Sequence, residues 1–387
     1  MKIGSFNIPF PGMNNIVSGM FPILMAMALL GLTVSCDVHQ FPEQKIEPEV
    51  PDDPDSPDNP PLPDDPDLYV DLNLALVYDT PMFLWEHFYD PKLGEVVEQY
   101  PDADVDGFHP GTTQRFDGLL QKGLKNVSVQ FFPKGSTGQY SKIEKFVSNI
   151  GPDDIYDMDL PIRLMPGYYD IVVWSDFKKY DDDKEFYDAS NFNSIKIDYD
   201  NYSANSDHRD SFRGRESAVN IEEDKSNFIV VEMRRPMAKY EFVTTDLSEF
   251  LDRETERRNL STRASIDDYI VKIFYSTYHP SAYSAVDDIL RDSTTGVNFQ
   301  TEVTVTGESE ASLGFDYVFI NDTQDGAIQA TIAVFDKKGE NVAQSVQISV
   351  PLRRDHHTML RGAFLTMNGS GGVGIDPGYN GDHNIIP

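Results

Sequence analysis

The segment YVDLNLALVY, residues 69–78, decides the fold class of this chain. Successive side chains of a β-strand point to opposite faces, so residues two apart share a face. One face of the segment is polar at Asp71 and Asn73, and the other is apolar at Val70, Leu72, Leu74 and Leu76. This alternation is typical of a strand with one buried face. The first strand is therefore predicted here, beginning at Tyr69.

Short runs of the same kind recur along the chain, separated by Gly, Pro, Asp and Asn. They predict strands at 127–132, 168–174, 195–199, 228–233, 239–244, 269–275, 297–306, 313–320, 328–335, 342–350 and 359–365. The main helical candidates are 248–259 and a short piece at 141–150. Residues 180–227 are polar and acidic, and they predict long surface loops around short strands. Many regularly spaced strands with few helices favour an all-β fold built from sandwiches.

A proline marks the predicted domain boundary. Pro236 lies in MRRPMAKYEF, between two strand-like runs, and a proline donates no hydrogen bond to a strand ladder. The boundary is therefore expected near residue 235. Two tandem β-sandwiches are predicted, at 68–235 and 236–387.

The N-terminal sequence predicts an export signal. The run MFPILMAMALLGLTVSCD, residues 20–37, stops at Cys36, the only cysteine, and suits a signal peptide better than a membrane-spanning helix. It resembles a bacterial lipoprotein signal ending in a lipobox, although Thr33 replaces the usual leucine. The resemblance implies removal of residues 1–35 and lipidation of Cys36. The alternative is an ordinary signal peptide that leaves a free thiol, and translation can start at Met1 or Met20.

An acidic spacer follows the cysteine. Residues 36–67 consist largely of Pro, Asp and Glu, with Lys45 as their one base, and such a chain is extended and disordered. The net charge of the whole chain is -32, which disfavours nucleic acid and anionic lipid surfaces as partners. Attachment to the outer membrane is therefore expected through a lipid on Cys36.

No motif predicts catalysis or a cofactor. A single cysteine excludes disulfides within the chain and a cysteine zinc site. The sequence contains no nucleophile elbow, phosphate-binding loop or zinc-protease motif. We expect a structural or binding protein without a cofactor.

One short motif resembles the start of a calcium loop. DADVDG supplies Asp102, Asp104 and Asp106 at suitable spacing, with a glycine for the sharp turn. The twelfth position is Thr113 and not a bidentate acid. In a chain with 64 acidic residues, a solvated loop is the preferred interpretation.

Two other features have an ordinary structural explanation. His356 and His357 are adjacent, so on a strand they point to opposite faces and cannot chelate a metal together. Trp174 could stack on a sugar, but it ends an apolar run and is expected in the core.

Five phrases in fixed order resemble one protein family. They are LPIRLMPGYYDIVVWSDF, FYDASNF, MRRPMAKYEFVTTDL, VPLRRDHHTMLRGAFLT and GGVGIDPGYNGD. Together with the lipobox they resemble the fimbrillin-related lipoproteins of Bacteroidales, and most closely the fimbrial anchor and accessory branch. The resemblance implies two transthyretin-like β-sandwiches that serve type V pili at the cell surface and support adhesion. Other fimbrial subunits would be the partners, joined by β-strand complementation, and the candidate partner strand consists of Tyr69, Val70, Leu72, Leu74 and Leu76.

Shaft subunits of that family lose their first strand to an arginine-specific protease. This chain has no arginine between Cys36 and Arg115, and the first predicted strand ends well before Arg115. An uncut spacer favours an anchor or accessory subunit. A processed shaft subunit, a tip adhesin and a glycan-binding surface lipoprotein remain as alternatives.

The mature N-terminus separates these interpretations. We expect mass spectrometry of the chain from outer membranes to find acylated Cys36 as the first residue, because no arginine precedes Arg115 in the spacer. A mature N-terminus directly after Arg115 would instead identify a processed shaft subunit.

Overall fold

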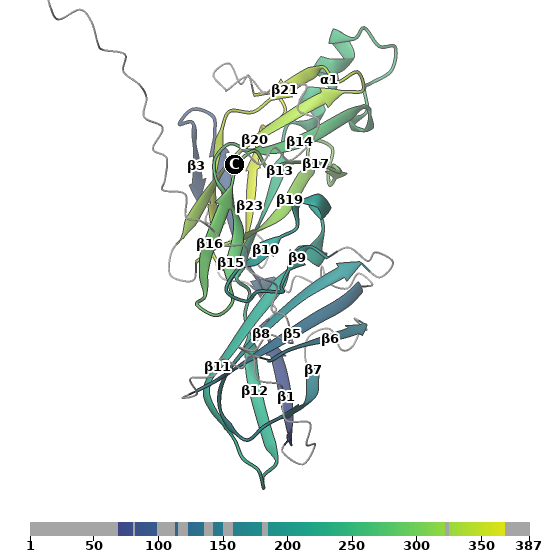
Figure 1. The fold of residues 1–387 in the computed structure, drawn as a ribbon. Coiled ribbons are helices and arrows are strands. Elements are labelled where there is room, and N and C mark those ends of the chain that lie inside the picture. The colour runs from purple at the N-terminus through teal and green to yellow at the C-terminus, as the bar shows by residue number, and fades with distance from the viewer. Residues whose placement is uncertain are drawn as a thin grey trace, which may run out of the picture. The chain divides into compact units, whose positions relative to one another are not determined.

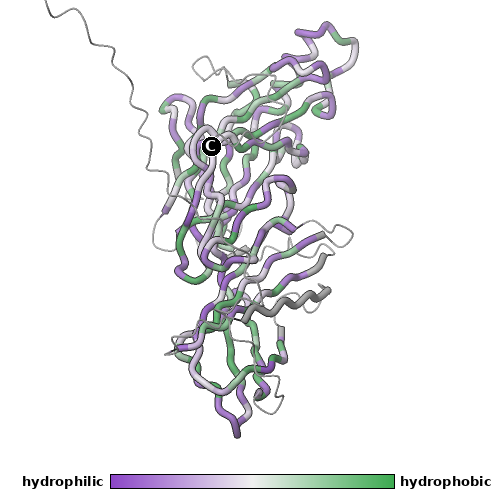
Figure 2. The backbone as a smooth tube through the Cα atoms, viewed as in Figure 1, coloured by the Kyte–Doolittle hydropathy of each residue, from purple (hydrophilic) through white to green (hydrophobic). Residues whose placement is uncertain are grey.

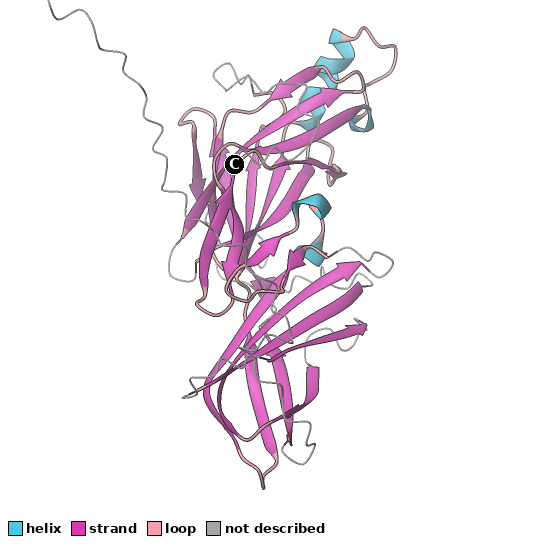
Figure 3. Cartoon of the chain, viewed as in Figure 1, coloured by secondary structure: helices cyan, strands magenta, loops and turns pink. Residues whose placement is uncertain are grey.

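The structure of the 387-residue chain is a computed structural model. It describes residues 69–79, 82–98, 113–114, 123–134, 142–149, 158–179, 185–321 and 325–367. Strands dominate these residues, and Figure 3 shows only short helical segments beside them, so the predicted all-β class is confirmed. The predicted signal peptide and spacer lie outside the described residues, as do the side chains of Cys36, Asp102, Asp104, Asp106 and Arg115.

Strand β1 (Val70–Tyr78) is the central strand of a three-stranded sheet. It pairs in parallel with β12 (Asn227–Met233) and antiparallel with β7 (Met158–Leu164); Figure 1 shows the three strands side by side. The predicted alternation is confirmed, because the alternate residues Leu72, Leu74 and Leu76 of β1 are each at most 1% exposed. Their burial holds β1 against the facing sheet.

A four-stranded sheet packs on the inner face of β1. Its order is β11–β8–β5–β6, formed by β5 (Gly123–Pro133), β6 (Lys142–Asn149), β8 (Gly167–Lys179) and β11 (Ser211–Ile221). Alternate residues of both sheets form one apolar core, which includes Val127, Val129, Phe131, Ile171 and Phe212. This sandwich contains the candidate partner strand.

The predicted short helix at 141–150 is wrong, because this segment is strand β6. It runs antiparallel to β5, from Lys142 opposite Phe131 to Asn149 opposite Leu124. A helix this short is costly to nucleate. The edge of β5 offers main-chain hydrogen bonds instead, so pairing between segments overrides the local preference.

Two further sheets form a second sandwich. The larger has the order β18–β19–β13–β23–β2–β3, with β4 beside β2. Its strands are β2 (Met82–Asp90), β3 (Glu95–Glu98), β4 (Thr113–Gln114), β13 (Met237–Thr244), β18 (Thr304–Val305), β19 (Ala311–Phe319) and β23 (His356–Gly362). The smaller has the order β17–β14–β20–β21, with β22 beside β20. Its strands are β14 (Tyr269–Tyr275), β17 (Asn298–Thr301), β20 (Gly326–Asp336), β21 (Asn341–Gln344) and β22 (Ile348–Leu352).

The apolar face of one helix completes the second core. The predicted helix at 248–259 is confirmed as α1 (Leu247–Arg257), which buries Leu247, Phe250 and Leu251. Figure 2 shows hydrophobic segments along the strands of this sandwich and hydrophilic segments at its turns. Among the described residues, the other helical turns are η3 (Tyr199–Asn201), η4 (Asp207–Arg209) and η5 (Ile266–Asp268).

The polar segment 180–227 is more ordered than the sequence predicts. It contributes β9 (Tyr187–Asp188) and β10 (Ile195–Ile197) to a sheet with β15 (His279–Ser284) and β16 (Ile289–Thr294). It also contains the whole of β11, which the sequence does not predict. The sequence SFRGRESAVNI hides its alternation because several outward residues and one bulge interrupt it.

Three buried ion pairs fix the segment before β11. Lys239 Nζ lies 2.8 Å from Asp207 Oδ1, and Arg235 Nε lies 2.8 Å from Asp210 Oδ2. The third pair joins Arg209 to Asp316. A buried charge that loses its partner costs several kcal/mol. These pairs therefore tie residues 207–210 to β13, to β19 and to the residues just before β13.

Strand β2 connects segments on both sides of residue 235. It pairs in parallel with β23, from Phe83 opposite His356 to Phe88 opposite Arg361. Only residues 79–81 separate it from β1, which belongs to the first sandwich. The domain boundary near 235 stays a prediction, and strands that precede it contribute to the sheet that follows it.

Glycine is required at residue 214, where β11 lies against β12 and leaves no room for a Cβ atom. A Cβ atom on Gly214 would lie 2.4 Å from Val231 Cγ1 and 2.6 Å from Met233 Sδ. We expect Gly214→Ala to lower the free energy of unfolding by about 1–3 kcal/mol, measured by urea denaturation. Gly307→Ala is the control, since its Cβ would meet Glu310 Cβ at 3.6 Å; equal losses in both variants would contradict the steric explanation.

The turn before β23 buries a carboxyl group. Asp355 has φ 57°, and its amide donates to Met237 O while its carbonyl accepts from Phe83 N. Its Oδ1 atom is buried and has no hydrogen-bond partner among the described residues. Burial raises the pKa of Asp355 to about 6, although Arg235 and Arg354 oppose the shift.

Between its ordinary pKa and about 6, Asp355 keeps a proton in the folded state that the unfolded chain releases. Its contribution to stability therefore falls as the pH rises through this window. We expect Asp355→Asn, which tolerates a positive φ, to raise the free energy of unfolding by about 1–3 kcal/mol at pH 7 and by little at pH 4. Urea denaturation at both pH values tests this, with the exposed Asp159→Asn as control; a gain that is the same at both would contradict it.

Candidate functional site

The predicted partner strand is built into the first sandwich. Tyr69 lies just before β1 and is half-buried, as is Val70, while Leu72, Leu74 and Leu76 face the core. The inner faces of the two neighbours are equally apolar. Without β1, a groove between β7 and β12 would be lined by Leu160, Ile162, Leu164, Val231 and Met233, all at most 2% exposed.

The C-terminal end of β1 is held by side-chain contacts. The hydroxyl of Tyr78 donates to Ser175 Oγ at 3.0 Å, and its ring lies edge-on to Phe212 at 5.1 Å. The ammonium group of Lys125 lies 4.3 Å from the same ring. These contacts join β1 to β8, β11 and β5, so displacement of β1 would disrupt the facing sheet as well.

The two outer strands of this sheet, β7 and β12, differ in the side chains that face outward. On β7 the outward residues are Asp159, Pro161 and Arg163; charge and proline at an edge oppose pairing with another chain. On β12 the outward residues include Phe228 and Val230, which are 56% and 47% exposed. The β12 side therefore offers the more apolar surface.

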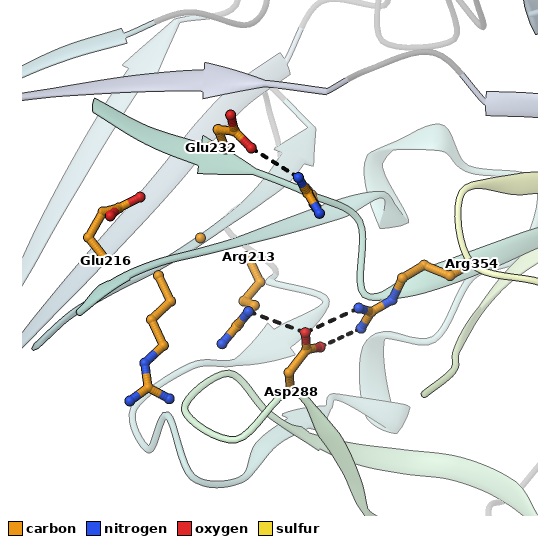
Figure 4. Close-up of a pocket in the computed structure, with 8 residues that line it drawn as sticks. Arg213, Glu216, Glu232, Asp288 and Arg354 are labelled. Atoms are coloured by element: carbon orange, nitrogen blue, oxygen red, sulfur yellow. Dashed lines mark hydrogen bonds and ion pairs between the residues drawn. The ribbon is translucent and has the colours of Figure 1, made fainter. Parts of the chain in front are cut away.

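A pocket rich in arginine lies where β11 and β12 meet (Figure 4). Its volume is about 240 Å³, and its lining consists of Arg213, Gly214, Arg215, Glu216, Glu232, Arg234, Asp288 and Arg354. Four arginines at one place stand out in a chain with net charge -32. Whether these arginines could bind an anion depends on the acidic side chains that already pair with them.

Asp288 is the centre of this pocket. Arg354 Nη2 donates to Asp288 Oδ1 at 2.5 Å, and Arg213 Nη1 lies 3.2 Å from Asp288 Oδ2. The hydroxyl of Tyr283 also donates to Asp288. Burial opposes ionisation, but these donors and charges outweigh it and lower the pKa of Asp288. The ionised Asp288 carboxylate therefore links β11 to the turns at 285–288 and 353–355.

The remaining charges of the pocket are also balanced. Arg234 Nη2 lies 3.0 Å from Glu232 Oε2, and Arg215 Nη2 lies 3.3 Å from Asp170 Oδ2. Burial and the nearby charge of Glu232 raise the pKa of Glu216. Because each arginine already has an acidic partner, the pocket supports packing of β11 more directly than capture of an anion.

The remaining sequence candidates are located as follows. Trp174 is 1% exposed and its ring contacts Tyr187 and Tyr283, so its predicted core position is confirmed. The ring centroid of His356 lies 5.3 Å from that of Phe83, whereas His357 Nε2 lies 3.1 Å from Glu241 Oε2. The histidines thus have separate surroundings, as expected from their alternation on β23.

The described residues contain neither a cluster of metal ligands nor a membrane-spanning helix. Among the described residues, no group of three or more His, Cys, Asp or Glu side chains is placed to hold a metal ion. No helix in the described ranges is long and apolar enough to cross a membrane.

The sequence does not reveal the arginine pocket, because its residues come from four separate segments. The local signals are the run Arg213-Gly214-Arg215 and the doublets Arg234-Arg235 and Arg353-Arg354. In each doublet one arginine lines the pocket and the other pairs with an acid elsewhere. Arg235 pairs with Asp210, and Arg353 pairs with Asp325. A doublet alone does not tell which member lines a pocket.

Several solved structures of fimbrial proteins resemble this chain. The tip fimbrial protein Mfa3 of Porphyromonas gingivalis, with a C-terminal truncation, has a TM-score of 0.35 at 8% identity, over 76% of this chain and 94% of that chain. A fimbrial assembly protein of Parabacteroides distasonis has a TM-score of 0.33 at 10% identity, over 78% of this chain and 93% of that chain. The fimbrial anchor protein Mfa2 of P. gingivalis has a TM-score of 0.32 at 12% identity, over 71% and 82%.

Likeness at these TM-scores does not carry function from one protein to another. No protein in the curated set matches the chain. A family model described as a family of unknown function, DUF6562, matches residues 127–386, more than half of the chain, and the chain belongs to that family.

Proposed function

We propose that this chain is a lipid-anchored surface subunit of a type V fimbrium, in an anchor or accessory position. It joins other fimbrial subunits by β-strand complementation and supports adhesion. The observation that carries the proposal is the position of β1. This first strand after the acidic spacer is paired on both sides and continues, after three residues, into a strand of another sheet.

The position of β1 favours a chain that is kept uncut. Cleavage after Arg115 would separate β1, β2, β3 and β4 from the rest of the chain, and these strands belong to two different sheets. It would leave β23 without its parallel neighbour β2 as well as opening the groove between β7 and β12. Loss of a single strand, as in a shaft subunit, requires a cut between β1 and β2, where the sequence has no arginine.

With β1 retained, a partner strand must add at an edge. The β12 side is the better candidate, because Phe228 and Val230 are exposed there and β7 carries Pro161. An added strand gains main-chain hydrogen bonds along the edge and buries its alternate side chains on neighbouring apolar surface.

The lipid and the spacer complete the proposal. A lipid on Cys36 would hold the chain at the outer membrane, and an extended spacer of residues 36–67 at about 3.1 Å per residue would let the sandwiches stand on the order of 90 Å from it. The five sequence phrases shared with fimbrillin-related lipoproteins support the same role. The buried Trp174 gives no support to a sugar platform at that residue.

Removal of the lipidation site tests the anchor role. In the bacterium that carries the gene, we expect Cys36→Ser to release the chain into the medium and to lower the amount of fibre on the cell surface several-fold, measured by quantitative immunoblotting and electron microscopy. Lys45→Ala is the matched control, because it changes the same segment and keeps the cysteine. Circular dichroism of both purified variants checks folding.

Two results would contradict the proposal. Surface fibre that is unchanged in Cys36→Ser cells would exclude an anchor. A chain that stays on the surface and brings down no fimbrial subunit when purified would favour the glycan-binding lipoprotein.

A further inference from the structure

The buried ion pair between Lys239 and Asp207 differs in chemistry from the other two that fix residues 207–210. Lys239 Nζ lies 2.8 Å from Asp207 Oδ1, and the two side chains are 1% and 11% exposed. The other two pairs use arginines, whose guanidinium groups keep their protons in proteins. A buried lysine can lose its proton and become a nucleophile. Of these three pairs, only this one brings together an amine and a carboxyl group that can react.

Aromatic rings enclose the amine. Lys239 Nζ lies 3.8 Å from the ring centroid of Phe315 and 5.4 Å from that of Tyr317, both on the neighbouring strand β19. Burial lowers the pKa of Lys239, although the carboxylate of Asp207 opposes the shift. Apolar surroundings disfavour two separate charges. A proton can therefore pass from the amine to the carboxylate without leaving the pair.

A hydroxyl group points at the same carboxyl oxygen. Tyr317 Oη donates to Asp207 Oδ1 at 2.8 Å, and burial and the Asp207 carboxylate hold the pKa of Tyr317 well above its ordinary value. The hydroxyl thus stays a donor, and a donor stabilises negative charge that develops on the oxygen it faces. The main chain of Asp207 is also held, because its carbonyl accepts from Asp210 N at 3.1 Å. Amine, carboxyl group and donor are therefore positioned before any reaction.

We propose that Lys239 and Asp207 condense into an intramolecular amide bond. Lys239 Nζ first gives one proton to the carboxylate, and the neutral amine then attacks Cγ of Asp207. The hydroxyl of Tyr317 holds Oδ1 while this oxygen carries negative charge. The bond between Cγ and Oδ2 breaks, and Oδ2 leaves as water with two of the three protons that Nζ carried. One C–N bond replaces one C–O bond, nothing is oxidised or reduced, and no co-reactant is needed.

The amide would act as a covalent staple in a chain that has no second cysteine for an internal disulfide. It removes two charges from the interior and closes a loop that contains β11 and β12, since both strands lie between residues 207 and 239. Closing a loop restricts the unfolded chain, as a disulfide does. The bond would join the segment before β11 to β13, and it is independent of the proposed fimbrial role.

Peptide mapping of the folded full chain tests the bond. Trypsin cuts after lysine and arginine unless proline follows, so an unlinked chain yields the linear peptides 197–209 and 235–239. We expect instead one branched peptide made of residues 197–209 and 235–253, because an acylated lysine is not cut. Its mass should be that of the two parts less one water molecule.

The same digest contains an internal control. Lys337 Nζ lies 2.7 Å from Asp268 Oδ1, but these side chains are 69% and 36% exposed. Water stabilises both charges there, so we expect the peptides that contain Lys337 and Asp268 to be recovered unlinked.

Variants assign the reacting groups. Lys239→Arg keeps a cation and cannot form this amide, so its digest should contain the linear peptide 197–209. Tyr317→Phe keeps the ring and removes the donor, and we expect it to slow bond formation about tenfold or more after dilution from urea. Tyr278→Phe is the matched control, since Tyr278 is 70% exposed. Mass spectrometry of timed digests measures the rates.

The proposal is overturned if the folded wild-type chain, checked by circular dichroism, releases peptide 197–209 in full as a linear species. A branched peptide that persists in Lys239→Arg would overturn the assignment to Lys239. Equal rates in Tyr317→Phe and Tyr278→Phe would overturn the part given to Tyr317. None of these results depends on whether the chain anchors a fimbrium.

Discussion

The three-residue link between β1 and β2 constrains the whole structure. Each of these strands is paired on both sides, β1 by β12 and β7 and β2 by β23 and β3, and they lie in different sheets. Residues 79–81 are too short to let one strand leave its sheet while the other stays undisturbed. The backbone bond from Asp79 N to Met233 O and that from Phe83 N to Asp355 O hold both ends of the link. Through β2, the first described strand, β1, is therefore fixed to the last described strand, β23.

The sequence predicts the strands that bury one face. β1 and β14 follow strict alternation, and both lie where the pattern places them; α1 is recognisable from its charged outer face and spaced apolar residues. Where packing depends on distant partners, the prediction fails. The segment 142–149 is polar enough to suggest a helix, but it forms strand β6 because the edge of β5 offers main-chain hydrogen bonds. β11 and β2 mix polar and apolar residues on both faces, since each borders a pocket.

The sites depend on residues that only the fold brings together. Arg213 and Arg354 are separated by most of the C-terminal half of the sequence, yet both donate to Asp288. A second recess, of about 540 Å³, has one wall from β2 and β3 and the other from β20 and β22, which lie more than 200 residues apart in the chain. No periodicity or motif in the sequence relates these segments. The predicted export signal is the opposite case, because a single cysteine at the end of an apolar run can be recognised without any structure.

The pairing of β1 also determines how the protein responds to mechanical force. A pull applied to the N-terminal end of β1, in the direction of the strand, loads its ladders with β12 and β7. The hydrogen bonds to β12 and β7 then carry the load together in shear and do not open one after another, because the ladders run along the direction of pull. Forced unfolding is governed by the rate of unfolding and not by equilibrium stability. A strand that is central, parallel on one side and joined by three residues to a strand of a second sheet therefore resists tension applied along its length.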